Sequence, residues 1–188
     1  MPTKQAVITS LFAGILLFTG DVGHIQSGTA FYAGEQGPRL LGVPVWVFFE
    51  FTLAVLALAL THSRRSSIFH WRTHPFTRGI LALSSAFTLM IYLSTSLPES
   101  SLAFKWTVLA GLFSAQIFLL RKIVIECLWD ALAIAAGGTV FEMLLGHLEI
   151  FQYTPGPHML ANVRAWLPLI YMSAALSARV LGDFLQKR

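Results

Sequence analysis

Residues 123–147 read IVIECLWDALAIAAGGTVFEMLLGH, an apolar run interrupted by three charged side chains, those of Glu126, Asp130 and Glu142. A helix needs about 20 apolar residues to cross the hydrocarbon core of a bilayer. Membrane β-strands are about 10 residues long and alternate apolar with polar residues, and this run does neither. Because the bilayer core offers the backbone no hydrogen-bond partners, the run is predicted to be a transmembrane α-helix.

Further apolar runs extend this pattern over most of the chain. Hydrophobic residues make up 55% of the 188 residues and charged residues 12%, about half the charged share of a soluble domain. The expected spans cover residues 5–22, 43–61, 79–97, 102–120, 123–147 and 165–182. Asp21 and His24 stand where a signal peptide would have small residues for cleavage, so the first run is expected to be retained. We therefore predict an all-α membrane protein, a six-helix bundle forming one domain over residues 1–188.

The basic residues alternate between the two sides of this predicted bundle. Ten fall on the side of the termini: Lys4, Arg64, Arg65, Arg72, Arg78, Arg121, Lys122, Arg179, Lys187 and Arg188. Three fall on the other side: Arg39, Lys105 and Arg164. Loops rich in Lys and Arg remain in the cytoplasm, so both termini are expected to be cytoplasmic. Glu126 and Asp130 are expected to join Arg121 and Lys122 in a charge cluster at this surface.

Two of the acidic residues inside expected spans, Glu50 and Glu142, lie well below the membrane surface, where ionisable groups are costly and often functional. Counted along the helices, Glu50 lies about 10 Å and Glu142 about 7–8 Å below the outer surface. No Lys or Arg is expected at that depth, so each carboxyl is either neutral or faces a wet or headgroup-filled cavity. The sequence leaves four roles open: a hydrogen bond to a neighbouring helix, a headgroup pocket, acid–base chemistry, and proton-coupled transport.

Motifs for catalysis or cofactor binding are absent from the sequence. There is no glycine-rich phosphate loop, no paired-histidine zinc motif and no nucleophile elbow. A single cysteine, Cys127, excludes an internal disulfide. We expect no metal, no cofactor and no nucleic-acid partner. A transporter would be favoured by an internal repeat, and none is detected between the first three spans and the last three.

The last third of the chain resembles the Insig (insulin-induced gene) family. Phe151-Gln152-Tyr153-Thr154 is similar to the family's Tyr-Gln-Tyr-Thr, and Arg164-Ala165-Trp166-Leu167-Pro168 to its Arg-Ser-Trp-Leu-Pro. Ser173 and Gly182 also fall where the family has Ser and Gly in its last span. The resemblance is weaker further up the chain, at Ile25-Gln26 and Val43-Pro44. The six-span layout also agrees with the family. The chain is similar to a bacterial Insig homologue of the mycobacterial type, which implies the bacterial plasma membrane as its location.

The resemblance implies a function without catalysis. Animal Insigs bind oxysterols in the membrane, retain the sterol sensor Scap in the endoplasmic reticulum, and help to target hydroxymethylglutaryl-CoA reductase for degradation. The family has an Asp at the start of its fourth span, where this chain has Leu97-Pro98-Glu99, so Scap-type binding is not implied. What carries over is a lipid cavity within a six-helix bundle, occupied by a diacylglycerol, a phospholipid or a sterol-like lipid.

The sequence therefore predicts a non-enzymatic membrane protein that binds a lipid and regulates a membrane-protein partner. The expected ligand-binding residues are Trp46, Glu50, Glu142, His147, Gln152, Tyr153 and Trp166. Gln152 and Tyr153 are expected to fold back onto the bundle, with Gln152 capping a helix or bonding a buried polar group, and Trp166 to close the cavity or anchor the interface. The alternative is a membrane-embedded enzyme acting on a lipid or isoprenoid, with Glu50 and Glu142 as acid and base. A homo-oligomer remains open.

Overall fold

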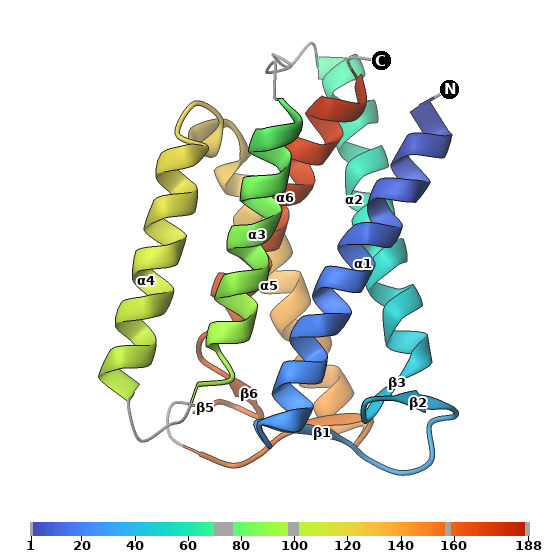
Figure 1. The fold of residues 1–188 in the computed structure, drawn as a ribbon, viewed down its shortest axis with the longest axis vertical. Coiled ribbons are helices and arrows are strands. Elements are labelled where there is room, and N and C mark those ends of the chain that lie inside the picture. Colours follow the sequence, from blue (N-terminus) through green and yellow to red (C-terminus); the bar gives the residue numbers. More distant parts are fainter. Residues whose placement is uncertain (1, 70–76, 98–101, 157–158, 187–188) are drawn as a thin grey trace.

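Six helices form one bundle in the computed structural model, which describes residues 2–69, 77–97, 102–156 and 159–186 (Figure 1). In chain order the helices are α1 (Pro2–Gln26), α2 (Val45–Phe69), α3 (Arg78–Ser94), α4 (Leu102–Leu119), α5 (Val124–His147) and α6 (Leu167–Gln186). Each lies over one of the six expected spans, which confirms the all-helical membrane fold. Both termini lie at one end of the bundle, here called the terminal end.

The outer surface of the bundle is apolar, as a surface in contact with lipid must be. Ile125, Trp129 and Phe118 are exposed by 86%, 80% and 69%. Among the residues that the structure describes, three segments are long and apolar enough to cross a membrane: Ala6–Gln26, Leu102–Leu119 and Val124–His147. Val45–Thr61 and Arg78–Ser94 are shorter apolar helices.

Helix α6 lies at the centre and contacts each of the other five helices (Figure 1). Pro168 lies in its first turn, as expected, where the missing N–H costs no helical hydrogen bond. The core around α6 includes a polar network at mid-span. Gln116 of α4 donates to the Thr88 hydroxyl at 3.1 Å, and its side-chain oxygen accepts from Ser173 at 2.7 Å. Such buried hydrogen bonds hold α3, α4 and α6 in one register.

Short strands close the opposite end, here called the strand end, where the sequence predicted only connections. They are β1 (Ala30–Tyr32), β2 (Arg39–Leu40), β3 (Val43–Pro44), β4 (Phe151–Tyr153), β5 (Met159–Leu160) and β6 (Val163–Arg164). Strand β1 pairs antiparallel with β4, with Phe31 opposite Gln152. The β2–β3 and β5–β6 pairs form two small hairpins. The outer loops are thus folded onto each other and onto the helices.

The strand end is built twice from the same unit of helix, strand, hairpin and helix. Backbone hydrogen bonds recur 121 positions apart: Thr29 N–H donates to the His24 carbonyl and Ile150 N–H to the Leu145 carbonyl, each at 2.9 Å. The turns of the hairpins recur 120 positions apart, with φ of +54° at Leu41 and +55° at Ala161. The unit α1–α2 is therefore repeated as α5–α6. A comparison of the first three spans with the last three does not detect this repeat, because α3 and α4 lie between its copies.

Several of the sequence-based interpretations fall outside the described residues. They concern the inner loop at 70–76, Pro98 and Glu99 before α4, and the last two residues of the chain. The side chains of 62–69 are also outside the description. The cytoplasmic orientation of the termini remains a prediction. Of the three cations expected at the strand end, Lys105 and Arg164 are buried and only Arg39 is exposed. Their burial leaves the strand end with less exposed positive charge, in agreement with the prediction.

Candidate functional site

Two carboxyl groups at the strand end are each held by a pair of tyrosine hydroxyls. Glu142 accepts hydrogen bonds from Tyr153 at 2.6 Å and from Tyr171 at 2.8 Å. Burial and the neighbouring carboxyl raise the pKa of the Tyr153 phenol well above its ordinary value, so it donates to Glu142 and does not ionise. The arrangement satisfies both oxygens of Glu142 and connects α5, β4 and α6.

The first copy of the repeated unit makes the corresponding contact. Asp21, 121 positions before Glu142, accepts hydrogen bonds from Tyr32 and from Tyr92, the latter at 2.9 Å. Tyr32 likewise lies 121 positions before Tyr153. The sequence analysis noted Asp21 near this surface but assigned it no role. Its spacing to Tyr32, the same as from Glu142 to Tyr153, is the signal that could have revealed both the contact and the repeat.

Glu50 differs from the other two carboxyls because its side chain makes no hydrogen bond within the described residues. It is half-buried and lines the same cavity as Asp21, Glu142 and Trp46. This cavity leaves about 20 Å³ for the centre of a water molecule, and one water needs about 10–15 Å³. Glu50 and Glu142 thus line one cavity, which has space for a water molecule and not for a lipid headgroup.

The remaining predicted site residues have different surroundings. Trp166 is buried, with its ring 5.1 Å from that of His24 and 5.6 Å from that of Tyr153, edge to face. His147 is exposed at the end of α5 and lines none of the cavities described here. Gln152 pairs with Phe31 through the backbone ladder, and its side chain makes no hydrogen bond with a described residue. The expected capping role of Gln152 is thus wrong, because in β4 its backbone pairs with Phe31 and its side-chain amide bonds no helix end among the described residues.

Two cations that the sequence assigned to the outer side of the bundle are buried in the strand end. Lys105 of α4 is fully buried and donates to the Thr95 carbonyl at 3.0 Å, at the carboxyl end of α3. A cation there is favoured by the negative end of the helix dipole. Arg164 donates to the Thr154 carbonyl at 2.7 Å and ties β6 to the chain after β4. Both cations have a structural role, and counting the basic residues of the sequence cannot distinguish them from cations in exposed loops.

A larger cavity lies between α2, α5 and α6, nearer the terminal end, and is here called the inner cavity. Its volume is about 290 Å³, close to the lower limit of about 300 Å³ for small-molecule pockets. Small side chains form much of its wall: Ala131, Ala133, Ala175 and Ala178. Thr61, Asp130 and Arg179 give it polar groups.

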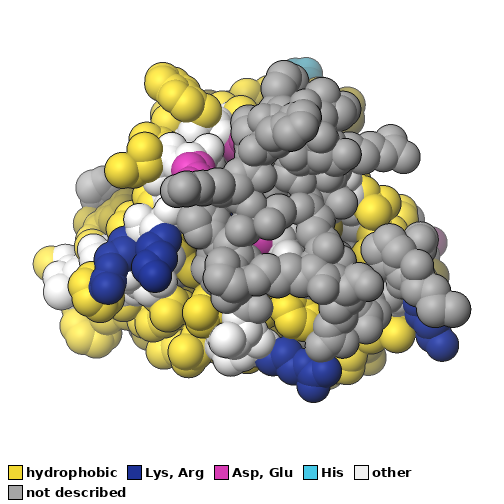
Figure 2. Space-filling view, turned by 90° about the horizontal axis from the view of Figure 1, so that it is seen from above, with side chains coloured by type: hydrophobic (Ala, Val, Ile, Leu, Met, Phe, Trp, Pro, Cys, Tyr) yellow, Lys and Arg dark blue, Asp and Glu magenta, His cyan; other side chains and the backbone are white. Residues whose placement is uncertain are grey.

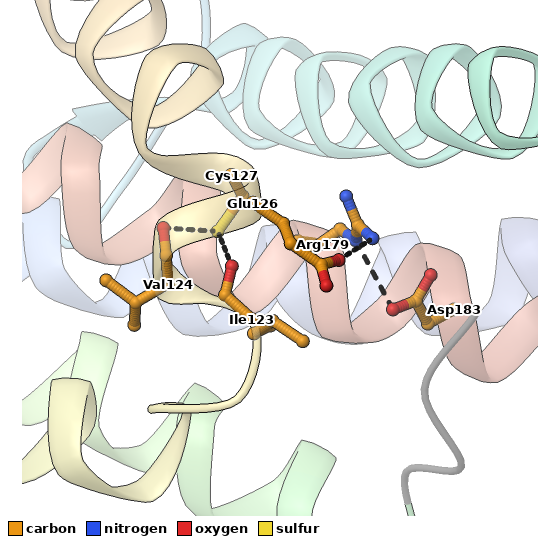
Figure 3. A network of polar contacts seen from close by, with 6 residues as sticks. All are labelled: Ile123, Val124, Glu126, Cys127, Arg179 and Asp183. Carbon is orange, nitrogen blue, oxygen red and sulfur yellow. Dashed lines mark hydrogen bonds and ion pairs between the residues drawn. The ribbon is translucent and has the colours of Figure 1, made fainter. Parts of the chain in front are cut away.

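Arg179 connects the inner cavity to a cluster of acidic residues (Figure 3). Its Nε donates to Asp183 at 3.3 Å, one turn further along α6, and its guanidinium lies 3.5 Å from Glu126 of α5. Arg179 and Asp183 are both buried. The expected surface cluster of Glu126 with Arg121 and Lys122 is therefore wrong: Glu126 faces α6, because α5 and α6 pack closely at this level. Within the described residues, no three His, Cys, Asp or Glu side chains are close enough together to bind a metal ion.

A second, apolar cavity lies beside the inner cavity and is here called the side cavity. It has a volume of about 90 Å³ and lies between α1, α2, α3 and α6. Ala178 of α6 lines both cavities. The two cavities thus share one lining residue of α6.

Comparison with known proteins supports the fold. The structure is similar to that of a mycobacterial Insig homologue, MvINS from Mycobacterium vanbaalenii, with a TM-score of 0.78 and 21% sequence identity over 98% of this chain and 95% of that one. The chain has the Insig fold. A cross-linked trimer of MvINS is also similar to it, with a TM-score of 0.80 and 20% identity over the same shares of the two chains. No family model and no curated protein sequence matches the chain. The Insig fold was thus correctly expected from the short motifs around Tyr153 and Trp166.

Proposed function

We propose that this protein is a non-enzymatic integral membrane protein that binds a neutral, hydroxyl-bearing membrane lipid, such as a diacylglycerol, in the inner cavity. The observation that carries this proposal is the cavity itself, about 290 Å³ of space among the spans with polar groups at one place and alanine methyl groups elsewhere. This combination suits a ligand with one small polar end and apolar chains. The headgroup is thus proposed nearer the terminal end than Glu50 and Glu142.

The charges around the inner cavity favour an uncharged headgroup. Arg179 is the cation that lines it, and Asp183 and Glu126 already lie against Arg179. Asp130 adds another carboxyl to the lining. A phosphate would meet more negative than positive charge there, and burying an uncompensated charge is costly. A hydroxyl or an ester can exchange hydrogen bonds with Arg179, Asp130 and Thr61 without that cost.

A lipid with two acyl chains fits the inner and side cavities better than a sterol, which has a rigid ring system. The inner and side cavities meet at Ala178, and the side cavity has an almost wholly apolar lining between α1 and α3. A lipid with its polar end at Arg179 could place one acyl chain in each space. A sterol would need one continuous slot, so the sterol-like alternative from the family resemblance takes second place.

Lipid analysis of the purified protein tests this proposal. The protein would be extracted in mild detergent, and the lipid retained per molecule would be measured by mass spectrometry. Ala133→Phe should reduce the retained neutral lipid several-fold, because Ala133 lines the inner cavity. Ala136→Phe is the matched control, since Ala136 is exposed one turn further along α5 and lines no described cavity. Equal retention by both variants, or none by the wild type, would contradict the proposal.

Orientation and assembly are proposed on the same basis. The excess of cations at the terminal end places that end in the cytoplasm of a bacterial cell. MvINS has been crystallised as a cross-linked trimer, and we propose a homo-oligomer here as well. Binding of a lipid would then regulate a membrane-protein partner by changing the surface that the bundle presents.

A transporter is the second candidate, because the repeat of α1–α2 as α5–α6 is typical of transporter folds. Glu50, Asp21 and Glu142 line one cavity between the two copies, where coupling ions bind in such proteins. A pH jump applied to proteoliposomes should then give a current that Glu50→Gln abolishes. Absence of current in the wild type would leave lipid binding as the proposed function.

A further inference from the structure

A groove between α3 and α4 at the terminal end combines an apolar floor with two cations at its rim. We call it the basic groove; it has a volume of about 530 Å³. Its apolar lining includes Ile80 and Phe87 of α3 and Ala115 of α4, and Arg121 and Lys122 stand at its end. The groove and the inner cavity share no lining residue.

The turn between α4 and α5 holds the two cations beside the groove. Hydrogen bonds from Ile123 N–H to the Leu120 carbonyl at 2.9 Å and from Leu120 N–H to the Gln116 carbonyl at 3.0 Å make this turn tight. The Arg121 guanidinium lies 4.7 Å from the centre of the Phe118 ring, a cation–π contact that fixes it over the end of α4. Figure 2 looks onto this end and shows Lys and Arg side chains next to hydrophobic ones at its rim.

The two cations are free of acidic neighbours. Neither Arg121 nor Lys122 forms an ion pair with an acidic residue in the part of the chain that the structure describes, and both are exposed. Glu126, the closest acidic residue in the sequence, is directed at Arg179 (Figure 3). Arg78, at the start of α3, is a further exposed cation two residues before Ile80. The charge of the rim is therefore available to an anion.

We propose that the basic groove binds an anionic phospholipid, with its phosphate between Arg121 and Lys122 and an acyl chain along Ile80, Phe87 and Ala115. Basic pockets between helices on the cytoplasmic side recognise such headgroups, and the apolar floor gives a lipid an advantage over a soluble phosphate. The inner cavity has the opposite charge balance and is proposed to hold a neutral lipid. The protein would thus hold two lipids of different charge at separate sites.

Native mass spectrometry of the detergent-solubilised protein tests this inference. Palmitoyl-oleoyl phosphatidylglycerol is titrated against palmitoyl-oleoyl phosphatidylcholine as probe lipids. The wild type should bind the anionic lipid more tightly, and Arg121→Gln should weaken that binding about fivefold, from about 1 kcal/mol per basic residue. Arg121→Lys keeps the charge and should retain most of the binding of the anionic lipid. Lys4→Gln is the control, because it removes one exposed cation from the same end away from the groove.

Filling the groove gives an independent test of the acyl-chain site. Ala115→Trp should weaken phosphatidylglycerol binding, whereas Ser114→Trp, at an exposed neighbouring position outside the groove lining, should not. Equal losses for Arg121→Gln and Lys4→Gln would show a net-charge effect and overturn the proposal. Equal affinity for the two lipids, or competition by inorganic phosphate at the same concentration as the lipid, would also overturn it. Loss of the neutral lipid from Ala133→Phe concerns the inner cavity, and binding of phosphatidylglycerol to the basic groove should be unchanged in that variant.

Discussion

The hydroxyl of Tyr153 donates a 2.6 Å hydrogen bond to Glu142, eleven residues earlier in the chain, and Tyr32 donates to Asp21 across the same separation. The two pairs occupy equivalent places in the repeated unit. Each joins a strand to the helix that precedes it, so the pairs fold both outer loops onto the bundle. The strand end is therefore held in place by carboxyl–tyrosine contacts, in which Asp21 and Glu142 accept hydrogen bonds that stabilise the fold.

Removing the Tyr153 hydroxyl should destabilise the protein. Tyr153→Phe keeps the ring against Trp166 but leaves one oxygen of Glu142 without its donor, at a cost of about 1 kcal/mol. Thermal unfolding in detergent measures the loss. The control is Gln152→Ala on the same strand, because the Gln152 side chain makes no hydrogen bond with a described residue. A larger loss for Gln152→Ala than for Tyr153→Phe would contradict the role assigned to the pair.

The polar network at mid-span predicts a second effect on stability. Gln116→Leu would remove the amide that donates to Thr88 and accepts from Ser173, and a hydrogen bond contributes about 0.5–1.5 kcal/mol to stability. Ser114→Leu, which faces outward from the same helix, should stay within about 0.5 kcal/mol of the wild type. The comparison is made by unfolding in detergent. A Gln116→Leu protein as stable as Ser114→Leu would show that the network does not bind α3, α4 and α6 together.

Labelling of single cysteines tests the predicted orientation. In a Cys127→Ser background, Glu35→Cys at the strand end should react with a membrane-impermeant maleimide added to intact cells, because Glu35 is exposed there. Lys122→Cys at the terminal end should react after the cells are opened. The reverse pattern would place the termini outside and would contradict the positive-inside assignment.

The sequence predicted the helices well because a span of about 20 apolar residues is a local signal. It missed the repeat, since the equivalent residues are 121 positions apart and few are identical. It did not predict the burial of Lys105, because the group that makes this buried charge tolerable, the Thr95 carbonyl, comes from the end of another helix. The cavities could not be located either: Ala133 and Gly138 belong to one run of small residues, yet one lines a cavity and the other lies against a tyrosine ring.

That difference between neighbouring small residues of α5 gives the sharpest stability prediction. A methyl group added at Gly138 would meet the Tyr171 ring at 2.5 Å, closer than real contacts allow. Tyr171 donates to Glu142 at 2.8 Å, so moving its ring would also disturb that carboxyl. Gly137 has nothing within 4 Å of the same added methyl, and alanine is about 1 kcal/mol better than glycine in a helix.

Gly138→Ala should therefore destabilise the bundle, and Gly137→Ala should leave it unchanged or slightly more stable. Both replacements make the same chemical change at adjacent residues of one helix, so thermal unfolding in detergent isolates the contact with Tyr171. In a Tyr171→Ala background, Gly138→Ala should cost less stability than it does in the wild type, because the smaller side chain makes room for the methyl group. Equal stability of Gly137→Ala and Gly138→Ala would mean that α5 and α6 do not approach each other as closely as this structure has them.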